Sequence, residues 1–235
     1  AFVPFVIFLF VAVIGLIVFL KYKAKNNIKL IKNKEIILLG RSVFHPFDAF
    51  GILKEKRMGS VIIASILLAL FYIVSAISDV ASGFAYNNFN VATYNSFFVF
   101  LRTIGLVALW VISNWLVCVL LGGIGKLKEI YIVTCYSLIP FIFSTILSVV
   151  LSNILVPDEF VFVSIFNTVC IVYTLFLLSI GIMKIHDYSF GKFLATTVLS
   201  IISMLIIVFL IFIIFMLAQQ VFGWFVTVFN ELTYG

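Results

Sequence analysis

The sequence predicts an all-α polytopic membrane protein with about six transmembrane helices, the last five of which form one bundle. Hydrophobic residues make up 65% of the 235 residues and charged residues only 10%, whereas soluble domains carry roughly 25% charged residues. The apolar residues are gathered into continuous runs of about 20 residues, which is the length of a membrane-spanning helix. These runs lack the alternation of a β-barrel strand, and they leave no length for a soluble domain.

An apolar run at residues 1–20 opens the chain, and the basic sequence KYKAK follows it directly. A signal peptide carries its positive charge before the apolar run, so this order indicates a span whose C-terminal end is cytoplasmic. Because the sequence does not begin with Met, we expect an exported portion before it. Residues 21–57 form a basic cytoplasmic segment, in which an interfacial helix is predicted to begin near Pro46. Its apolar side is expected to comprise Phe44, Phe47, Phe50 and Leu53.

Residues 58–217 are predicted to form a five-helix membrane domain. Its spans are expected at residues 58–81, 97–121, 130–151, 160–183 and 193–217. An Asn-rich loop and the short turn SNILVPDE connect spans on the outer side. A Gly- and Lys-bearing hinge at 122–129 and the loop KIHDYSFGK connect them on the inner side. The tail at 218–235 is aromatic and amphipathic, and we expect it to rest at the outer interface.

The distribution of basic residues tests this topology, because Lys and Arg in short loops are retained on the cytoplasmic side. Of the fifteen Lys and Arg residues, ten fall in the first basic segment, two in the hinge and two in the last inner loop, so only Arg102 lies toward the outside. The protein is therefore expected to be a multi-pass plasma-membrane protein with both ends of this sequence outside. The net charge of +6 indicates contact with anionic lipid headgroups, and no motif indicates nucleic acid binding.

Small and basic residues recur at the inner ends of three spans, in the sequences KEKRMGS, GKLK and GK. If these loops converge, they form one cationic patch for lipid phosphate or for an acidic partner surface. Ordinary charge anchoring of the helix ends is the alternative interpretation. The residues expected in such a patch are Lys54, Lys56, Arg57, Lys126, Lys128, Lys184, His186 and Lys192.

The hinge sequence GGIGKLKE resembles a nucleotide phosphate loop only superficially. A Walker-type loop needs a glycine four residues ahead of its Gly-Lys pair and a hydroxyl residue after it, and Leu120 and Leu127 stand at those positions. The glycines are instead expected to permit a tight turn that the lysines anchor to headgroups. No cofactor is predicted.

The two histidines each lie beside an acidic residue, His45 near Asp48 and His186 next to Asp187. These four residues could form a metal site if their loops met. Hydrogen bonding by interfacial histidines is the interpretation we favour, because no span carries an HExxH-like pairing. We therefore predict no metal site and no catalytic residues.

A few polar, charged or helix-breaking residues stand in or near the spans. Asp79 and Arg102 lie at the outer ends of adjacent spans, where a salt bridge clamping the helices is favoured over a substrate contact. Four further residues are expected to pack helices together, with a solute pathway as the alternative. These are Asn114, Trp115, Pro140 and Asn167.

The sequence NWLVCVLLGGIGKLKEIYIVTCYSLIPF, with HPFDAFGILKEKRMGS before it and IHDYSFGKFLATTVLSI after it, resembles the bacterial branch of the Yip family. The resemblance covers about residues 44–217. It implies five membrane helices with the leading end cytoplasmic and the trailing end outside, an arrangement that spans two to six share. Eukaryotic relatives are named for interacting with Ypt/Rab GTPases and act as adaptors in vesicle traffic, whereas some bacterial members accompany solute importers.

The resemblance implies a non-enzymatic scaffold or accessory subunit with a membrane-protein partner, an ABC-type importer being one candidate. It carries over no catalytic residue. The alternative is a transporter or channel that acts alone or as a homo-oligomer, which requires a water-accessible cavity near Asn114 and Asn167. An intramembrane enzyme would need a nucleophile-base pair, an acidic dyad or a metal triad at depth, and the spans show none.

Overall fold

The computed structural model describes residues 33–83, 94–156 and 159–234, and these ranges fold into helices without a strand. The elements are α2 (Asn33–Phe44), α3 (Pro46–Lys56), α4 (Val61–Ala81), α5 (Ser96–Phe100), η1 (Leu101–Gly105), α6 (Leu106–Leu120), α7 (Leu127–Ser137), α8 (Ile139–Ser152), α9 (Phe160–His186) and α10 (Phe190–Tyr234). Five stretches are long and apolar enough to cross a membrane, and they match predicted spans two to six. The all-α polytopic class is thereby confirmed, while the predicted first span, 1–20, lies outside the described residues.

Two of the five spans are continuous helices with a local irregularity. The second consists of α5, a π-helical turn η1 and α6, and the third consists of α7 and α8. Pro140 explains the irregularity between α7 and α8, because proline has no backbone N–H to donate and is tolerated only in the first turn of a helix. The π-helical turn carries Arg102 and has no comparable signal in the sequence.

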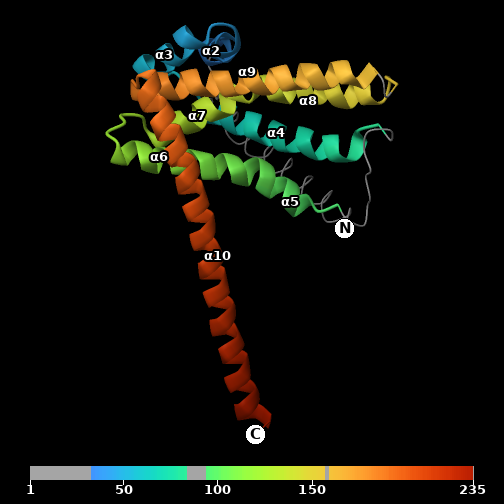
Figure 1. Ribbon diagram of the computed structural model, residues 1–235, viewed down its shortest axis with the longest axis vertical. Helices are drawn as coiled ribbons and strands as arrows, with labels where there is room; N and C mark the ends of the chain where they lie inside the picture. The colour runs from blue at the N-terminus through green and yellow to red at the C-terminus, as the bar shows by residue number, and fades with distance from the viewer. Residues whose placement is uncertain (1–32, 84–93, 157–158, 235) are drawn as a thin grey trace, which may run out of the picture.

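The bundle is built from α4, α6, α7, α8 and α9, with α2 and α3 packed across one end (Figure 1). The close helix pairs include α4 with α7 and α8, α8 with α9, and α3 with α9. Helix α3 begins at Pro46 as predicted, but its apolar residues divide. Phe50 and Leu53 are buried in the bundle, whereas Phe47 is exposed. Phe44, which we expected on the same side, is exposed at the end of α2. The buried face of the helix therefore coincides only in part with the one expected, because it includes Ala49 and omits Phe47.

A glycine allows the closest helix contact in this core. A Cβ atom placed on Gly181 in α9 would lie 2.2 Å from Cγ1 of Val133 in α7 and 3.4 Å from the ring of Phe50 in α3. Real Cβ atoms do not approach so closely, so α9 reaches α7 only because this position has no side chain. The three helices thus meet near the end of the bundle that holds the hinge between α6 and α7. Following the predicted topology, we call this end the inner end and the opposite end the outer end.

Helix α10 leaves the bundle and runs away from it toward the C-terminus (Figure 1). Its first turns pack on α6, with Thr196 and Ser200 fully buried, but every side chain from 208 to 227 is exposed. At 45 residues it is about 67 Å long, roughly twice the thickness of the bilayer core. The helix continues without a break through residues 218–234, where we expected a separate interfacial tail.

Candidate functional site

The hinge between α6 and α7 packs directly on the turn between α9 and α10. The backbone N–H of Gly125 donates a hydrogen bond to Nδ1 of His186 at 3.2 Å. A Cβ on Gly125 would lie 2.3 Å from Cγ2 of Ile185, and one on Gly123 would lie 2.4 Å from the hydroxyl oxygen of Tyr188. These glycines are therefore required by close approach. Only Gly122, with a φ of 70°, serves the turn conformation that the sequence suggested.

His186 and Tyr188 form the centre of this contact. Their rings stack with centroids 5.0 Å apart, and His186 is 3% exposed. Tyr188 lies in the loop between α9 and α10, and burial raises the pKa of its phenol above the ordinary value. We expected His186 in a surface patch for lipid or a partner. The structure buries it as an internal acceptor for the hinge, which removes it from that surface.

The three inner connections converge, as the recurring small and basic residues predicted. The linker between α3 and α4 meets the hinge at a shared pocket, and the hinge meets the α9–α10 turn. Lys54, in the last turn of α3, forms an ion pair with Asp187 in the connection between α9 and α10. The inner end of the protein is therefore one connected surface, although its parts lie far apart in the sequence.

The Lys and Arg residues expected in the cationic patch fall into groups with different contacts. Three of them are engaged within the protein: Lys54 with Asp187, Lys192 with its Nζ 4.6 Å from the ring centroid of Tyr188, and Lys184 with its Nζ 5.9 Å from that of Phe47. Lys56 is exposed. The remaining three, Arg57, Lys126 and Lys128, are exposed and line one pocket. The sequence alone could not separate these groups.

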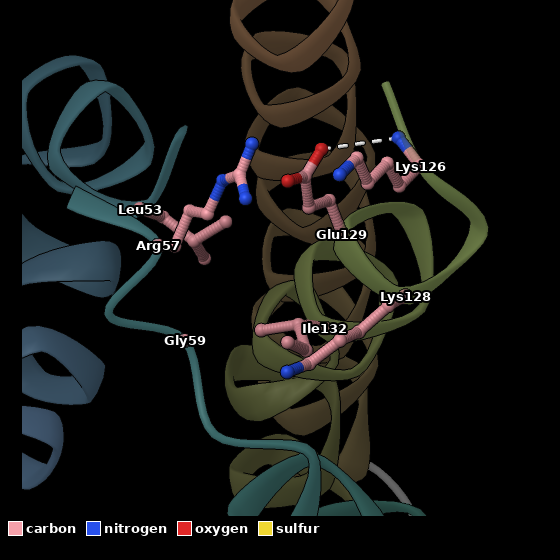
Figure 2. A pocket seen from close by; sticks show the side chains of 7 residues that line it. All are labelled: Leu53, Arg57, Gly59, Lys126, Lys128, Glu129 and Ile132. Carbon is pink, nitrogen blue, oxygen red and sulfur yellow. Dashed lines mark hydrogen bonds between the residues drawn. The ribbon is translucent and has the colours of Figure 1, made fainter. Parts of the chain in front are cut away.

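Figure 2 shows this pocket, which we call the inner basic pocket. Its volume is about 150 Å³, and the residues that line it are Leu53, Arg57, Gly59, Lys126, Lys128, Glu129 and Ile132. Arg57 belongs to the linker after α3 and has a left-handed backbone, with a φ of 49°. The lysines stand at the start of α7, where Oε2 of Glu129 accepts a hydrogen bond from the backbone N–H of Lys126 at 3.0 Å. Within the described ranges no ion pair engages the three cationic side chains.

The intramembrane polar residues make contacts between helices. Asn114 is fully buried in α6, and its Nδ2 donates to Oγ of Ser200 in α10 at 3.3 Å. Oδ1 of Asn167 in α9 accepts from Oγ of Ser144 in α8 at 2.7 Å. Trp115 is half-buried against the cluster of apolar side chains that includes Cys118 and Ile182, and Pro140 is buried at the start of α8. These contacts are those expected of packing residues.

Asn167 also lines a second cavity near the outer ends of α4, α8 and α9. The volume of this cavity is about 210 Å³. Its remaining lining is mostly hydroxyl groups and comprises Ser78, Ser82, Ser148, Ser152, Phe160, Val163 and Ser164. Asn114 does not line this cavity, so the two asparagines expected at a solute pathway do not share it.

The outer face carries the predicted clamp between α4 and the second span. Nη2 of Arg102 lies 2.6 Å from each carboxylate oxygen of Asp79. Both side chains are partly exposed, at 54% for Arg102 and 31% for Asp79. Exposed ion pairs contribute little to stability, typically about 0.2–1 kcal/mol, so this pair orients the two helix ends more than it stabilises them.

The described part of the chain contains no group of three or more His, Cys, Asp and Glu side chains arranged to hold a metal ion. His45 is exposed at the start of α3, while His186 is buried against the hinge. The two histidines therefore occupy different surroundings, and Nδ1 of His186 is already an acceptor for Gly125.

Comparison with known proteins gives one result. No curated protein and no solved structure matches the chain. A model of the Yip1 domain matches residues 40–214, which is well over half of the sequence. The matched region contains every bundle helix, the inner basic pocket and the start of α10. The chain therefore belongs to the Yip1 family and is an integral membrane protein of that family.

Proposed function

We propose that the protein is a non-enzymatic scaffold or accessory subunit of a membrane assembly, with a solute importer of the ABC type as a candidate partner. The observation that carries this proposal is the exposed length of α10. Residues 193–230 contain no charged side chain, and the positions from 208 to 227 are all exposed. A helix that is apolar all round must be covered by lipid or by protein. Held away from its own bundle, α10 can present its full circumference to a neighbouring membrane protein.

The intramembrane polar groups support the same proposal. The side-chain amides of Asn114 and Asn167 form hydrogen bonds with Ser200 and Ser144 of neighbouring helices. Ion-coupled carriers place ionisable residues at mid-depth to bind and move their substrates. The charged residues of these spans instead lie near the helix ends, as with Asp79 and Arg102. A packing role for the polar residues fits a scaffold better than a carrier.

Site-specific photo-crosslinking in the native membrane tests this proposal. A photoreactive residue at Phe209 or Phe215 of α10 is expected to give adducts with another membrane protein. The matched control is Val172 of α9, which is 61% exposed, similar to the 62% of Phe209, but belongs to a helix packed into the bundle. We expect only lipid adducts there. Lipid adducts alone at both α10 positions, together with a monomer in several mild detergents, would contradict a partner role.

The transporter alternative rests on the serine-lined cavity at Asn167. A polar cavity of about 210 Å³ is large enough to hold several water molecules or a small neutral solute. This alternative requires uptake by the purified protein in liposomes and loss of that uptake in Asn167→Leu. Absence of uptake for small polar solutes, with the partner adducts described above, favours the accessory role.

A further inference from the structure

We propose that the inner basic pocket binds a phosphate group, supplied in the membrane by the headgroup of an anionic lipid. This inference does not depend on whether the protein has a protein partner. It rests on three cationic side chains from two separate segments that surround one small cavity: Arg57 from the linker before α4, and Lys126 and Lys128 from the start of α7.

The charges around the pocket match a phosphate monoester. Arg57, Lys126 and Lys128 contribute three positive charges and Glu129 one negative charge, so the lining has a net charge of about +2. A phosphate monoester carries roughly −1.5 to −2 at neutral pH. Glu129 already accepts the backbone N–H of Lys126 and thereby holds the start of α7 in place. Its carboxylate is thus part of the pocket wall.

The three cationic side chains of the pocket differ from the other basic residues nearby because they are free to bind an anion. Lys54 is paired with Asp187, and Lys192 and Lys184 lie over aromatic rings. Arg57, Lys126 and Lys128 have no such ion-pair partner among the described side chains. The planar guanidinium of arginine matches two phosphate oxygens at once, while lysine contributes a compact charge. An incoming phosphate therefore breaks no existing ion pair.

The size and position of the pocket favour a headgroup over a nucleotide. Sites for drug-sized ligands and cofactors are usually about 300–1,000 Å³, whereas this pocket is about 150 Å³. Its inner wall is apolar, because Leu53 and Ile132 are buried beneath the cationic rim. It lies where the spans that contain α4 and α7 begin. A lipid phosphate at this level can keep its glycerol and acyl chains in the membrane.

Gly59 brings the two sides of the pocket together. A Cβ atom at this position would lie 3.0 Å from Cγ2 of Ile132 and 3.2 Å from Cγ of Leu53. The linker that carries Arg57 can therefore lie against α7 because this position has no side chain. The small and basic sequence KRMGS thus has a physical reason that charge anchoring alone does not supply.

Native mass spectrometry of the protein in mild detergent, titrated with phosphatidic acid, tests the proposal. Arg57→Gln and Lys128→Gln are each expected to weaken phosphatidic acid binding about fivefold, since one basic residue near an anionic surface contributes about that factor. Lys56→Gln is the matched control, because Lys56 is exposed beside Arg57 but does not line the pocket. It should change binding less than twofold, and phosphatidylcholine binding should be unchanged in all variants.

The proposal is overturned if Arg57→Gln and Lys128→Gln weaken binding no more than Lys56→Gln does, because charge alone would then explain the affinity. Competition with millimolar inorganic phosphate separates the two sources of the ligand. Phosphate that leaves the lipid bound supports the headgroup, whereas displacement that requires Arg57 and Lys128 supports the phosphate site with the free ion as ligand. Thermal unfolding of each variant checks folding, and Lys126→Gln replaces any variant that fails it.

Discussion

Replacing Gly181 with valine is expected to lower the free energy of unfolding by about 1–3 kcal/mol, the usual cost of inserting side-chain atoms into a packed core. Even a Cβ at this position would lie 2.2 Å from Cγ1 of Val133 and 3.4 Å from the ring of Phe50. The new side chain must therefore push α9 away from both α7 and α3. Thermal unfolding of the detergent-solubilised protein, followed by tryptophan fluorescence, measures the effect.

Gly191→Val is the matched control for this prediction. Gly191 is also helical, in the first turn of α10, and a Cβ there has no atom within 4 Å. The same substitution should change the free energy of unfolding by less than about 0.5 kcal/mol, as surface substitutions usually do. Equal destabilisation by the two variants would contradict the close α7–α9 contact.

His186→Ala is expected to loosen the hinge. The substitution removes the acceptor for the Gly125 N–H and the ring that stacks on Tyr188. The Gly125 N–H is partly buried, so we expect a cost toward the lower end of the range of about 1–3 kcal/mol for a fully buried unsatisfied donor. The lost ring contacts add to that cost. Cys118 reports the loosening directly, because this residue is 1% exposed and a Cβ built on Gly123 would lie 3.0 Å from its Cβ. A small maleimide should therefore label Cys118 faster in the variant.

Two further variants separate the causes in this experiment. His186→Phe retains an aromatic ring against Tyr188 but accepts no hydrogen bond, so labelling of Cys118 should be intermediate. His45→Ala changes the only other histidine, which is exposed at the start of α3, and should leave labelling unchanged. If His186→Ala labels at the rate of the unaltered protein, the hinge does not depend on His186.

Hydrophobicity and charge were sufficient to predict the membrane spans and the ion pair between Asp79 and Arg102. A continuous apolar run of about 20 residues is most simply explained by a membrane-spanning helix. Opposite charges at the neighbouring ends of two such helices lie close enough to form an ion pair. The π-helical turn that carries Arg102 could not be predicted. A π-helical turn differs from an α-helical one in its backbone hydrogen bonds, which no residue type in this segment predicts.

The inner face was predicted in outline but not in detail. Recurring small and basic residues indicated that the loops converge, yet they could not show that Gly125 is needed by contact with Ile185. Nor could they show that Lys54 is paired while Lys128 lines a pocket. Such distinctions depend on which side chains from distant segments meet. A single sequence carries no information about contacts between distant segments. For this reason His186 was predicted on the surface, although it is buried against the hinge.

The buried face of α3 and the length of α10 also differ from the prediction, because both depend on what packs against each helix. The amphipathic pattern of α3 grouped Phe47 with Phe50, but packing on α9 buries only Phe50. In α10, the apolar residues after Leu217 continue the helix without a break. Composition predicts which residues avoid water, but not whether lipid, the bundle or another protein covers them.

Impermeant maleimide labelling of single cysteines in intact cells determines whether the inner basic pocket faces the cytoplasm. The cysteines are introduced as Lys128→Cys at the pocket and Glu159→Cys at the opposite end, both exposed positions, after Cys118, Cys135 and Cys170 are replaced by alanine. We predict labelling of Glu159→Cys in intact cells and labelling of Lys128→Cys only after the membrane is permeabilised. Labelling of Lys128→Cys in intact cells, with protection of Glu159→Cys, would place the pocket on the extracellular side and reverse the predicted topology.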